Sequence, residues 1–210
     1  MLLTFDTCLD KTYVALAENG NIIDTKTIDN NGSTYHSAYL ISTIKDILNN
    51  NNVKPSEITE IATDIGPGSF TGIRACMTVA KVMSQQLNIK AIGISSLEII
   101  SKLHQANNRN LVLLDARKNM TYVWDEEILG AINIEDVKEM VKADKYSIVC
   151  DESMYKIFSE ITDNIKIYTQ CNKNLAEIMV DIITKNPKKY KEYNKKLTPL
   201  YIQPPPVFGK

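Results

Sequence analysis

A short pattern that the chain uses twice decides its fold. The first copy is Leu2-Leu3-Thr4-Phe5-Asp6-Thr7-Cys8-Leu9-Asp10-Lys11-Thr12-Tyr13-Val14, an apolar run that ends at an acidic residue and returns five residues later. The second copy begins at Leu111-Val112-Leu113-Leu114-Asp115 and returns, with the same spacing, at Thr121-Tyr122-Val123. Each copy predicts a β-strand, a tight turn and a second strand.

The two copies lie about half the chain apart, and helix-forming segments follow each of them. Internal duplication explains this offset better than coincidence does. Two similar α/β lobes, each opening with a β-hairpin that carries an acidic residue, define the actin-like ATPase (ASKHA) fold, which sugar kinases and Hsp70 share. We therefore expect an N-terminal lobe at 1–105 and a shortened C-terminal lobe at 106–210, the latter with a lysine-rich and proline-rich tail.

The periodicity of apolar residues predicts the elements of each lobe. Strands are expected at 2–7, 11–17, 21–28, 58–65 and 89–94, with helices at 34–50, 70–87 and 95–105. In the second lobe, strands are expected at 111–116, 120–125, 146–150 and 165–168, with helices at 134–142, 152–160 and 173–185.

A glycine-rich run joins an expected strand to an expected helix. Its sequence is Gly66-Pro67-Gly68-Ser69-Phe70-Thr71-Gly72-Ile73-Arg74. A strand, a glycine turn and a helix start expose backbone N–H groups where proteins often hold phosphates. The alternative is a plain turn, in which the glycines reverse the chain and Ser69 caps the helix. The run matches neither the Walker nor the GxGxxG spacing, so the plain turn is favoured.

The same nine residues resemble the signature of the TsaB (YeaZ) family, bacterial proteins of tRNA threonylcarbamoyladenosine biosynthesis. Other segments that agree are Leu2-Leu3-Thr4-Phe5-Asp6-Thr7, His36-Ser37, Asp115-Ala116-Arg117 and Pro199-Leu200-Tyr201-Ile202. The likeness is dense up to Arg117 and thin from there to Thr198. It implies a non-catalytic paralogue of TsaD, a scaffold that binds and activates TsaD in a complex with the ATPase TsaE.

By this resemblance, the complex transfers threonylcarbamoyl to the adenosine 3′ of the anticodon in tRNAs that read codons beginning with A. The partner proteins would bind ATP and a metal ion, and this chain would need no cofactor of its own. The runner-up function is an ATP-dependent phosphotransferase of the sugar-kinase type.

A kinase reading requires glycines in the hairpin turns, because backbone N–H groups must approach the phosphates closely. Here the turns read Cys8-Leu9-Asp10-Lys11 and Arg117-Lys118-Asn119-Met120, and neither contains glycine. Asp6 and Asp115 remain weak candidates for approaching the magnesium ion of a nucleotide, and Ser69 for holding an anion. A structural role for the two aspartates at the hairpin ends is favoured.

The sequence suggests no catalytic group. TsaD places two histidines four residues apart on its first helix to bind a metal, whereas here His36 is followed at that spacing by Leu40. The other histidine, His104, has no ligand-like spacing. No nucleophile, base and oxyanion constellation supports a peptidase either. We therefore expect neither a metal site nor a catalytic residue in this chain.

The first two helices are the expected partner surface. The helix at 70–87 is apolar over about twice the width that one buried face requires, and the first helix carries tyrosines opposite its apolar stripe. In TsaB relatives these helices bind TsaD or, in its absence, a second copy, so we expect a homodimer of the isolated chain. The interface residues implied are Tyr35, His36, Tyr39, Gly68, Phe70, Gly72, Arg74, Cys76 and Met77. Cys76 and Val82 stand where many relatives have glycine.

Composition sets the remaining expectations. A net charge of −1 provides no global field for nucleic acid, so tRNA is expected to be met through the complex. The tail could add a local contact through Tyr190 and Tyr193 and the lysines around them, although a solvated segment is favoured. Those lysines are Lys185, Lys188, Lys189, Lys191, Lys195 and Lys196. Four scattered cysteines and no long apolar run indicate a cytoplasmic protein without a membrane span.

Overall fold

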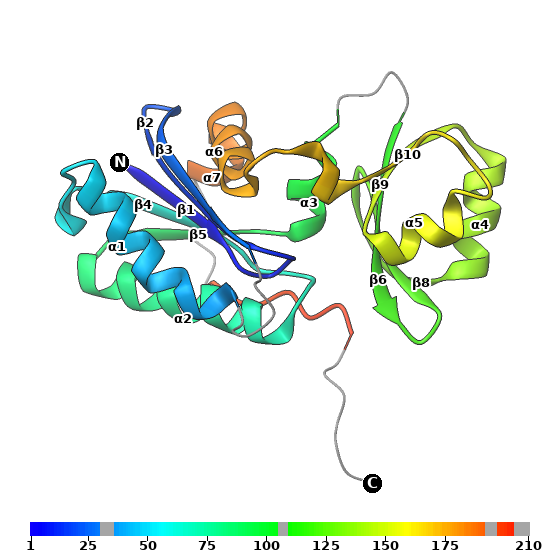
Figure 1. Cartoon of the computed structure of the whole chain (residues 1–210), viewed down its shortest axis with the longest axis horizontal. Coiled ribbons are helices and arrows are strands. Elements are labelled where there is room, and N and C mark those ends of the chain that lie inside the picture. The colour runs from blue at the N-terminus through cyan, green and yellow to red at the C-terminus, as the bar shows by residue number, and fades with distance from the viewer. Residues whose placement is uncertain (30–35, 105–108, 192–196, 204–210) are drawn as a thin grey trace, which may run out of the picture. The chain divides into compact units, whose positions relative to one another are not determined.

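A computed structural model of the chain describes residues 1–29, 36–104, 109–191 and 197–203. They form two compact units, each built on one five-stranded mixed sheet (Figure 1). Unit 1 comprises Met1–Ile99 and Lys173–Leu200, and unit 2 comprises Ile100–Asn172 with the described residues after Leu200. The expected α/β fold is confirmed. The division differs from 1–105 and 106–210, because the chain returns to unit 1 near its end.

Unit 1 combines one sheet with helices on both of its faces. Its strands are β1 (Leu2–Asp6), β2 (Thr12–Glu18), β3 (Asn21–Ile28), β4 (Glu60–Asp64) and β5 (Lys90–Ile94). Its helical elements are η1 (His36–Tyr39), α1 (Leu40–Asn50), η2 (Pro55–Glu57), α2 (Phe70–Leu87), α6 (Leu175–Lys185) and α7 (Pro187–Lys191). The strand order is β3-β2-β1-β4-β5, with the first three strands antiparallel and β1, β4 and β5 parallel. Helix α3 (Ser96–Ser101) carries the chain into unit 2.

Unit 2 repeats this arrangement. Its strands are β6 (Arg109–Arg117), β7 (Met120–Asp125), β8 (Glu127–Asn133), β9 (Tyr146–Cys150) and β10 (Ile165–Ile167). Its helical elements are α4 (Ile134–Ala143), α5 (Glu152–Phe158) and η3 (Tyr168–Cys171). The strand order is β10-β9-β6-β7-β8. Taken from its other edge, β8-β7-β6-β9-β10, it places the third, second, first, fourth and fifth strands of the unit side by side, which is the order of unit 1.

The duplication extends to single hydrogen bonds. At the end of β1, the Cys8 N–H donates to Asp6 Oδ1 at 2.6 Å, and at the end of β6 the Arg117 N–H donates to Asp115 Oδ1 at 2.7 Å. Both units therefore begin with the same aspartate-stabilised turn, as the repeated sequence pattern predicts.

The core of unit 1 lies between the sheet and helices α1 and α2, while α6 covers the opposite face (Figure 1). Leu3 and Phe5 of β1 point into the core shared with α1 and α2. Thr4, between them, donates its hydroxyl to the Ala176 carbonyl of α6 at 2.8 Å. Alternation along one strand therefore supports both helical layers. Seven of the eleven residues of α6 are buried, which explains why this late segment joins unit 1.

The described part of the lysine-rich tail is anchored in unit 1 through Lys189 and Tyr190. Tyr190 is 2% exposed, and its hydroxyl donates to Glu98 Oε1 at 2.9 Å, while Lys189 Nζ lies 2.7 Å from the same oxygen. The suggestion that Tyr190 stacks on a nucleic-acid base is therefore corrected, because its ring lies in the core. Tyr193, Lys195 and Lys196 lie outside the described residues.

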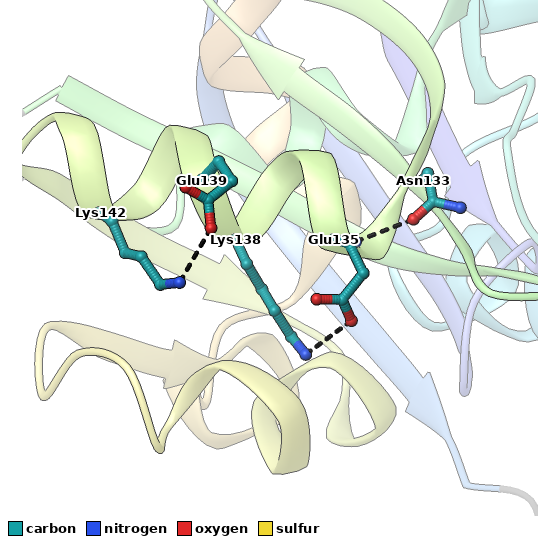
Figure 2. A network of polar contacts seen from close by, with 5 residues as sticks. All are labelled: Asn133, Glu135, Lys138, Glu139 and Lys142. Carbon is teal, nitrogen blue, oxygen red and sulfur yellow. Dashed lines mark hydrogen bonds and ion pairs between the residues drawn. The ribbon is translucent and has the colours of Figure 1, made fainter.

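Helix α4 of unit 2 shows why polar stretches form regular elements here. Asn133 caps it by accepting the Glu135 N–H at 2.9 Å, and ion pairs of 2.9 Å join Glu135 to Lys138 and Glu139 to Lys142 (Figure 2). Such contacts support a solvent-facing helix surface, while its apolar side packs on the sheet.

Candidate functional site

The glycine-rich run packs directly against the first hairpin turn. A Cβ atom at Gly72 would lie 1.8 Å from the Thr7 carbonyl oxygen, and one at Gly68 would lie 2.3 Å from the Cys8 carbonyl oxygen. Only glycine fits at either position, because the obstacle is the backbone of the hairpin turn, which cannot move aside as a side chain could. These two glycines therefore serve the approach of helix α2 to the turn.

The N–H groups of the glycine-rich run are largely used within the protein. Ser69 N–H donates to the Cys8 carbonyl at 2.7 Å, and Ser69 Oγ accepts the Gly72 N–H at 3.3 Å as the cap of α2. Gly66, in the left-handed region at φ +100°, donates its N–H to Asp64 Oδ1 at 2.7 Å. A phosphate requires free N–H groups, so the capped turn expected as the alternative describes this run better than a phosphate cradle.

Two carboxyl groups are buried behind the turn. Asp6 and Asp64 are both fully buried, and Ser96 Oγ donates to both carboxylate oxygens of Asp64 at 2.8 and 2.7 Å. Burial raises the pKa of Asp64 to about 6, although the hydrogen bonds from Gly66 and Ser96 oppose that rise. Burial, and next the neighbouring Asp64, raise the pKa of Asp6 well above its usual range. Asp6 is therefore placed to hold a proton inside the unit, a poor position for approaching a nucleotide-bound magnesium ion.

Two buried thiols lie beside these carboxyl groups. The Thr7 N–H donates to Cys76 Sγ at 3.1 Å, and Cys8 Sγ lies 3.5 Å from the Asp64 carbonyl oxygen. Burial raises the pKa of the Cys8 thiol. Burial would do the same for Cys76, but hydrogen bonds from Cys8, Thr63 and Thr7 outweigh it and lower the pKa of that thiol. Sequence reasoning missed this cluster, because its members are far apart in the chain and share no ligand-like spacing.

Several expected interface residues prove to be interior. Gly72, Cys76 and Met77 are buried within unit 1, which corrects their assignment to an exposed partner surface. The reason is that this side of α2 faces the sheet and the hairpin turn. Tyr35 and the side chain of His36 lie outside the described part of the chain.

Helices α1 and α2, together with the turn η1 that leads into α1, nevertheless keep large apolar side chains in contact with solvent. We call these four the exposed apolar set; their exposed fractions are 45% for Tyr39, 69% for Ile41, 46% for Phe70 and 51% for Val82. Of the other expected interface residues, Gly68 and Arg74 are exposed, and the Arg74 guanidinium carbon lies 5.4 Å from the centre of the Phe70 ring. An aromatic ring beside an arginine is a common feature of protein interfaces.

The corresponding turn of unit 2 is more open. Asp115 is exposed, and its N–H donates to Asp151 Oδ2 at 2.6 Å. The next turn residues, Arg117, Lys118 and Asn119, all have left-handed backbone, with φ of 61°, 51° and 60°. Side chains thus occupy a turn that glycines would keep bare for a phosphate.

Fold and site together define a two-lobed, actin-like protein whose first hairpin turn is closed against its own helix. The family model that matches residues 28–191 is described as TsaD, tRNA N6-adenosine threonylcarbamoyltransferase. The chain belongs to this family and, within it, to the TsaB (YeaZ) proteins.

Individual relatives agree with this assignment. The chain is 25% identical over 205 residues to the tRNA threonylcarbamoyladenosine biosynthesis protein TsaB of Buchnera aphidicola subsp. Schizaphis graminum, covering 90% of this chain and 95% of the relative. It is 34% identical over 126 residues to the protein of the same name from Buchnera aphidicola subsp. Baizongia pistaciae, covering 59% of this chain and 55% of that relative. The structure of YeaZ from Pseudomonas aeruginosa has the same fold, with a TM-score of 0.71 at 19% identity, covering 95% of this chain and 98% of that one. Among the described residues, no helix is both long and apolar enough to cross a membrane.

Proposed function

We propose that this chain is a non-catalytic scaffold that binds and activates a TsaD-type transferase in the cytoplasm. Its relatives are named as tRNA threonylcarbamoyladenosine biosynthesis proteins, which sets the pathway. The observation that carries the scaffold role is the closed turn of unit 1. Backbone fills the space beside Thr7 and Cys8, and Asp6 is fully buried, so a nucleotide has no evident access there.

The exposed apolar set supports the second half of the proposal. A lone exposed leucine or isoleucine needs no explanation, but four large apolar side chains on α1, α2 and the adjoining turn η1 favour a partner. In this proposal α1 and α2 contact TsaD, TsaE completes the complex, and tRNA is bound by the assembly. Without TsaD, the same helices would pair two copies of this chain.

Reconstitution with single-residue variants tests the proposal. Purified TsaD, TsaE and the enzyme that forms the threonylcarbamoyl adenylate are assayed for modified tRNA with the natural chain, with Ile41→Glu and with Val82→Glu. Both variants place a charge on the exposed apolar set, so activation and TsaD binding should fall at least about 10-fold. Leu129→Glu is the matched control, because Leu129 is 42% exposed on β8 and belongs to unit 2, whereas both helices belong to unit 1.

Two results would reject the scaffold role. One is tRNA modification that proceeds equally well without this chain. The other is tight binding of ATP to the isolated chain in calorimetry, lost in Asp6→Ala, which would favour the phosphotransferase alternative. Equal activation by all three variants would instead move the partner surface away from α1 and α2.

A further inference from the structure

Three metal-ligand side chains meet behind the first hairpin turn. They are Asp6 at the end of β1, Cys8 in the turn and Cys76 on α2. One carboxylate oxygen and the two sulfur atoms all lie within 4.8 Å of one another. All three side chains are at most 1% exposed. The hairpin and the helix therefore bring one oxygen and two sulfur ligands to a single buried point.

The carboxyl group at this point has an unused oxygen. Asp6 Oδ1 accepts the Cys8 N–H, but Asp6 Oδ2 is buried and has no hydrogen-bond partner among the described residues. Within the same part of the chain, no lysine, arginine or histidine forms an ion pair with Asp6 or Asp64. Burying an acidic group without a partner is costly, so the orphaned oxygen calls for a proton or a cation.

The sulfur atom of Cys76 has the surroundings of a metal ligand. Cys76 Sγ accepts the Thr7 N–H at 3.1 Å, and the Thr7 hydroxyl oxygen lies 3.0 Å from the same sulfur. The contact from the Thr7 N–H fixes the direction of this ligand and stabilises its thiolate. The neighbouring Asp64, by contrast, is satisfied by Gly66 and Ser96, which leaves Asp6 as the oxygen ligand.

We propose that Asp6, Cys8 and Cys76 form a binding site for a divalent cation of the zinc type. Two thiolates and one carboxylate suit Zn²⁺, whereas Mg²⁺ and Ca²⁺ prefer oxygen ligands alone. Ligand atoms of a tetrahedral zinc ion lie roughly 3.3 to 3.8 Å apart, as bonds of about 2.0 to 2.3 Å require. The observed limit of 4.8 Å needs at most a small contraction toward the ion. Binding would release one proton from each thiol, and the proton of Asp6, to solvent.

The cation would have a structural role. It would fasten the β1–β2 turn to helix α2 at the point where Gly72 already brings the two backbones together. This role is independent of the partner contacts proposed above, because none of its three ligands is exposed.

The test uses the whole chain, purified under reducing conditions and equilibrated with Zn²⁺ alone or Co²⁺ alone. Native mass spectrometry should find one Zn²⁺ per chain, and Co²⁺ should give the sulfur-to-metal charge-transfer absorption of a thiolate site. Cys8→Ser and Cys76→Ser preserve side-chain size but replace the soft ligand, so each should weaken Zn²⁺ binding about 100-fold or more. Cys171→Ser is the matched control, since Cys171 belongs to another part of the chain, and it should bind normally.

A second measurement avoids variants that fail to fold. In the natural protein, Zn²⁺ should slow alkylation of Cys8 and Cys76 at least about 10-fold and leave that of Cys171 unchanged, because a bound thiolate is no longer free to react. The proposal is overturned if the natural chain binds less than one Zn²⁺ at saturation, or if the Co²⁺ complex lacks thiolate absorption. Binding that survives in both serine variants, or alkylation that Zn²⁺ does not slow, would overturn it equally.

Discussion

Replacing Gly72 with alanine tests whether the closed hairpin turn holds unit 1 together. The added Cβ atom would lie 1.8 Å from the Thr7 carbonyl oxygen, whereas ordinary contacts begin at 3.4 Å. The turn and the helix must therefore separate by about 1.6 Å. A side-chain rotamer change cannot relieve this clash, because the atoms that the Cβ would meet belong to the backbone of Thr7 and Cys8.

The expected loss follows from three contributions. Overpacking against backbone costs about 3 kcal/mol, at the upper end of the usual range. The Thr7 hydroxyl would lose its 2.8 Å hydrogen bond to the Gly72 carbonyl, which costs about 1 kcal/mol. Alanine is the better helix former by about 1 kcal/mol, which offsets part of the loss. Gly72→Ala should therefore lower the free energy of unfolding by about 3 kcal/mol and leave a folded protein.

Urea unfolding followed by far-ultraviolet circular dichroism measures this loss, and hydrogen exchange of peptides from β1 and α2 locates it. Thr78→Ala is the matched control on the same helix, where Thr78 is exposed, and it should change stability by less than about 0.5 kcal/mol. A Gly72→Ala protein as stable as the natural chain, or more so, would refute the reasoning. The higher helix propensity of alanine would then outweigh the steric clash in setting the stability of the variant.

Two further predictions concern buried polar groups. Folding raises the pKa values of both Asp6 and Asp64. Their contribution to the free energy of unfolding is therefore complete at a pH below the pKa of the unfolded chain. It is lost as the pH rises through the pKa values of the folded protein. For Asp64, whose pKa rises from 3.8 to about 6, this loss of unfolding free energy is about 3 kcal/mol. Urea unfolding at several pH values measures the loss, and the Asp6→Asn protein should lose less stability over the same pH range than the natural chain does. Tyr190→Phe should cost about 1 kcal/mol by removing the hydroxyl that donates to Glu98, whereas an unchanged urea midpoint would contradict that role.

The sequence was sufficient for the parts of the fold that depend on local pattern. Both hairpins were predicted because an apolar run and a repeated Asp–turn–Thr-Tyr-Val spacing are visible along the chain. Strand β8 was not, because its residues Glu127 to Leu129 are exposed and Gly130 interrupts it, so it lacks the pattern of a buried strand. Its place is set by pairing with β7, a contact that local periodicity does not record.

The assignment of α6 failed for a related reason. Its periodicity identified a helix at 173–185, but order along the chain suggested the second lobe. The Asn174 side chain, which caps α6, donates to the Lys26 carbonyl of β3 at 3.0 Å and thereby ties the helix to the sheet of unit 1. Such long-range partners are not encoded in spacing. The cluster of Asp6, Cys8 and Cys76 was missed in the same way, since α2 reaches the turn only through tertiary packing.

Comparing the two turns indicates what the duplication has been used for. Both units place one aspartate near the end of the first strand, Asp6 or Asp115. A second aspartate ends the neighbouring parallel strand or directly follows it, Asp64 in β4 and Asp151 after β9. In unit 1 the segment after the second aspartate is rich in glycine, which lets α2 close over the turn and bury both acids. In unit 2, Asp151 caps α5 directly and Asp115 stays exposed. The same strand arrangement therefore has its aspartates buried beneath α2 in unit 1, whereas in unit 2 the aspartate of the first strand, Asp115, is exposed. The contact between the first hairpin turn and Gly72 fixes the start of α2. A substitution at this contact should therefore change partner binding only by shifting that helix. A substitution in the exposed apolar set should weaken binding and leave the stability of the chain unchanged.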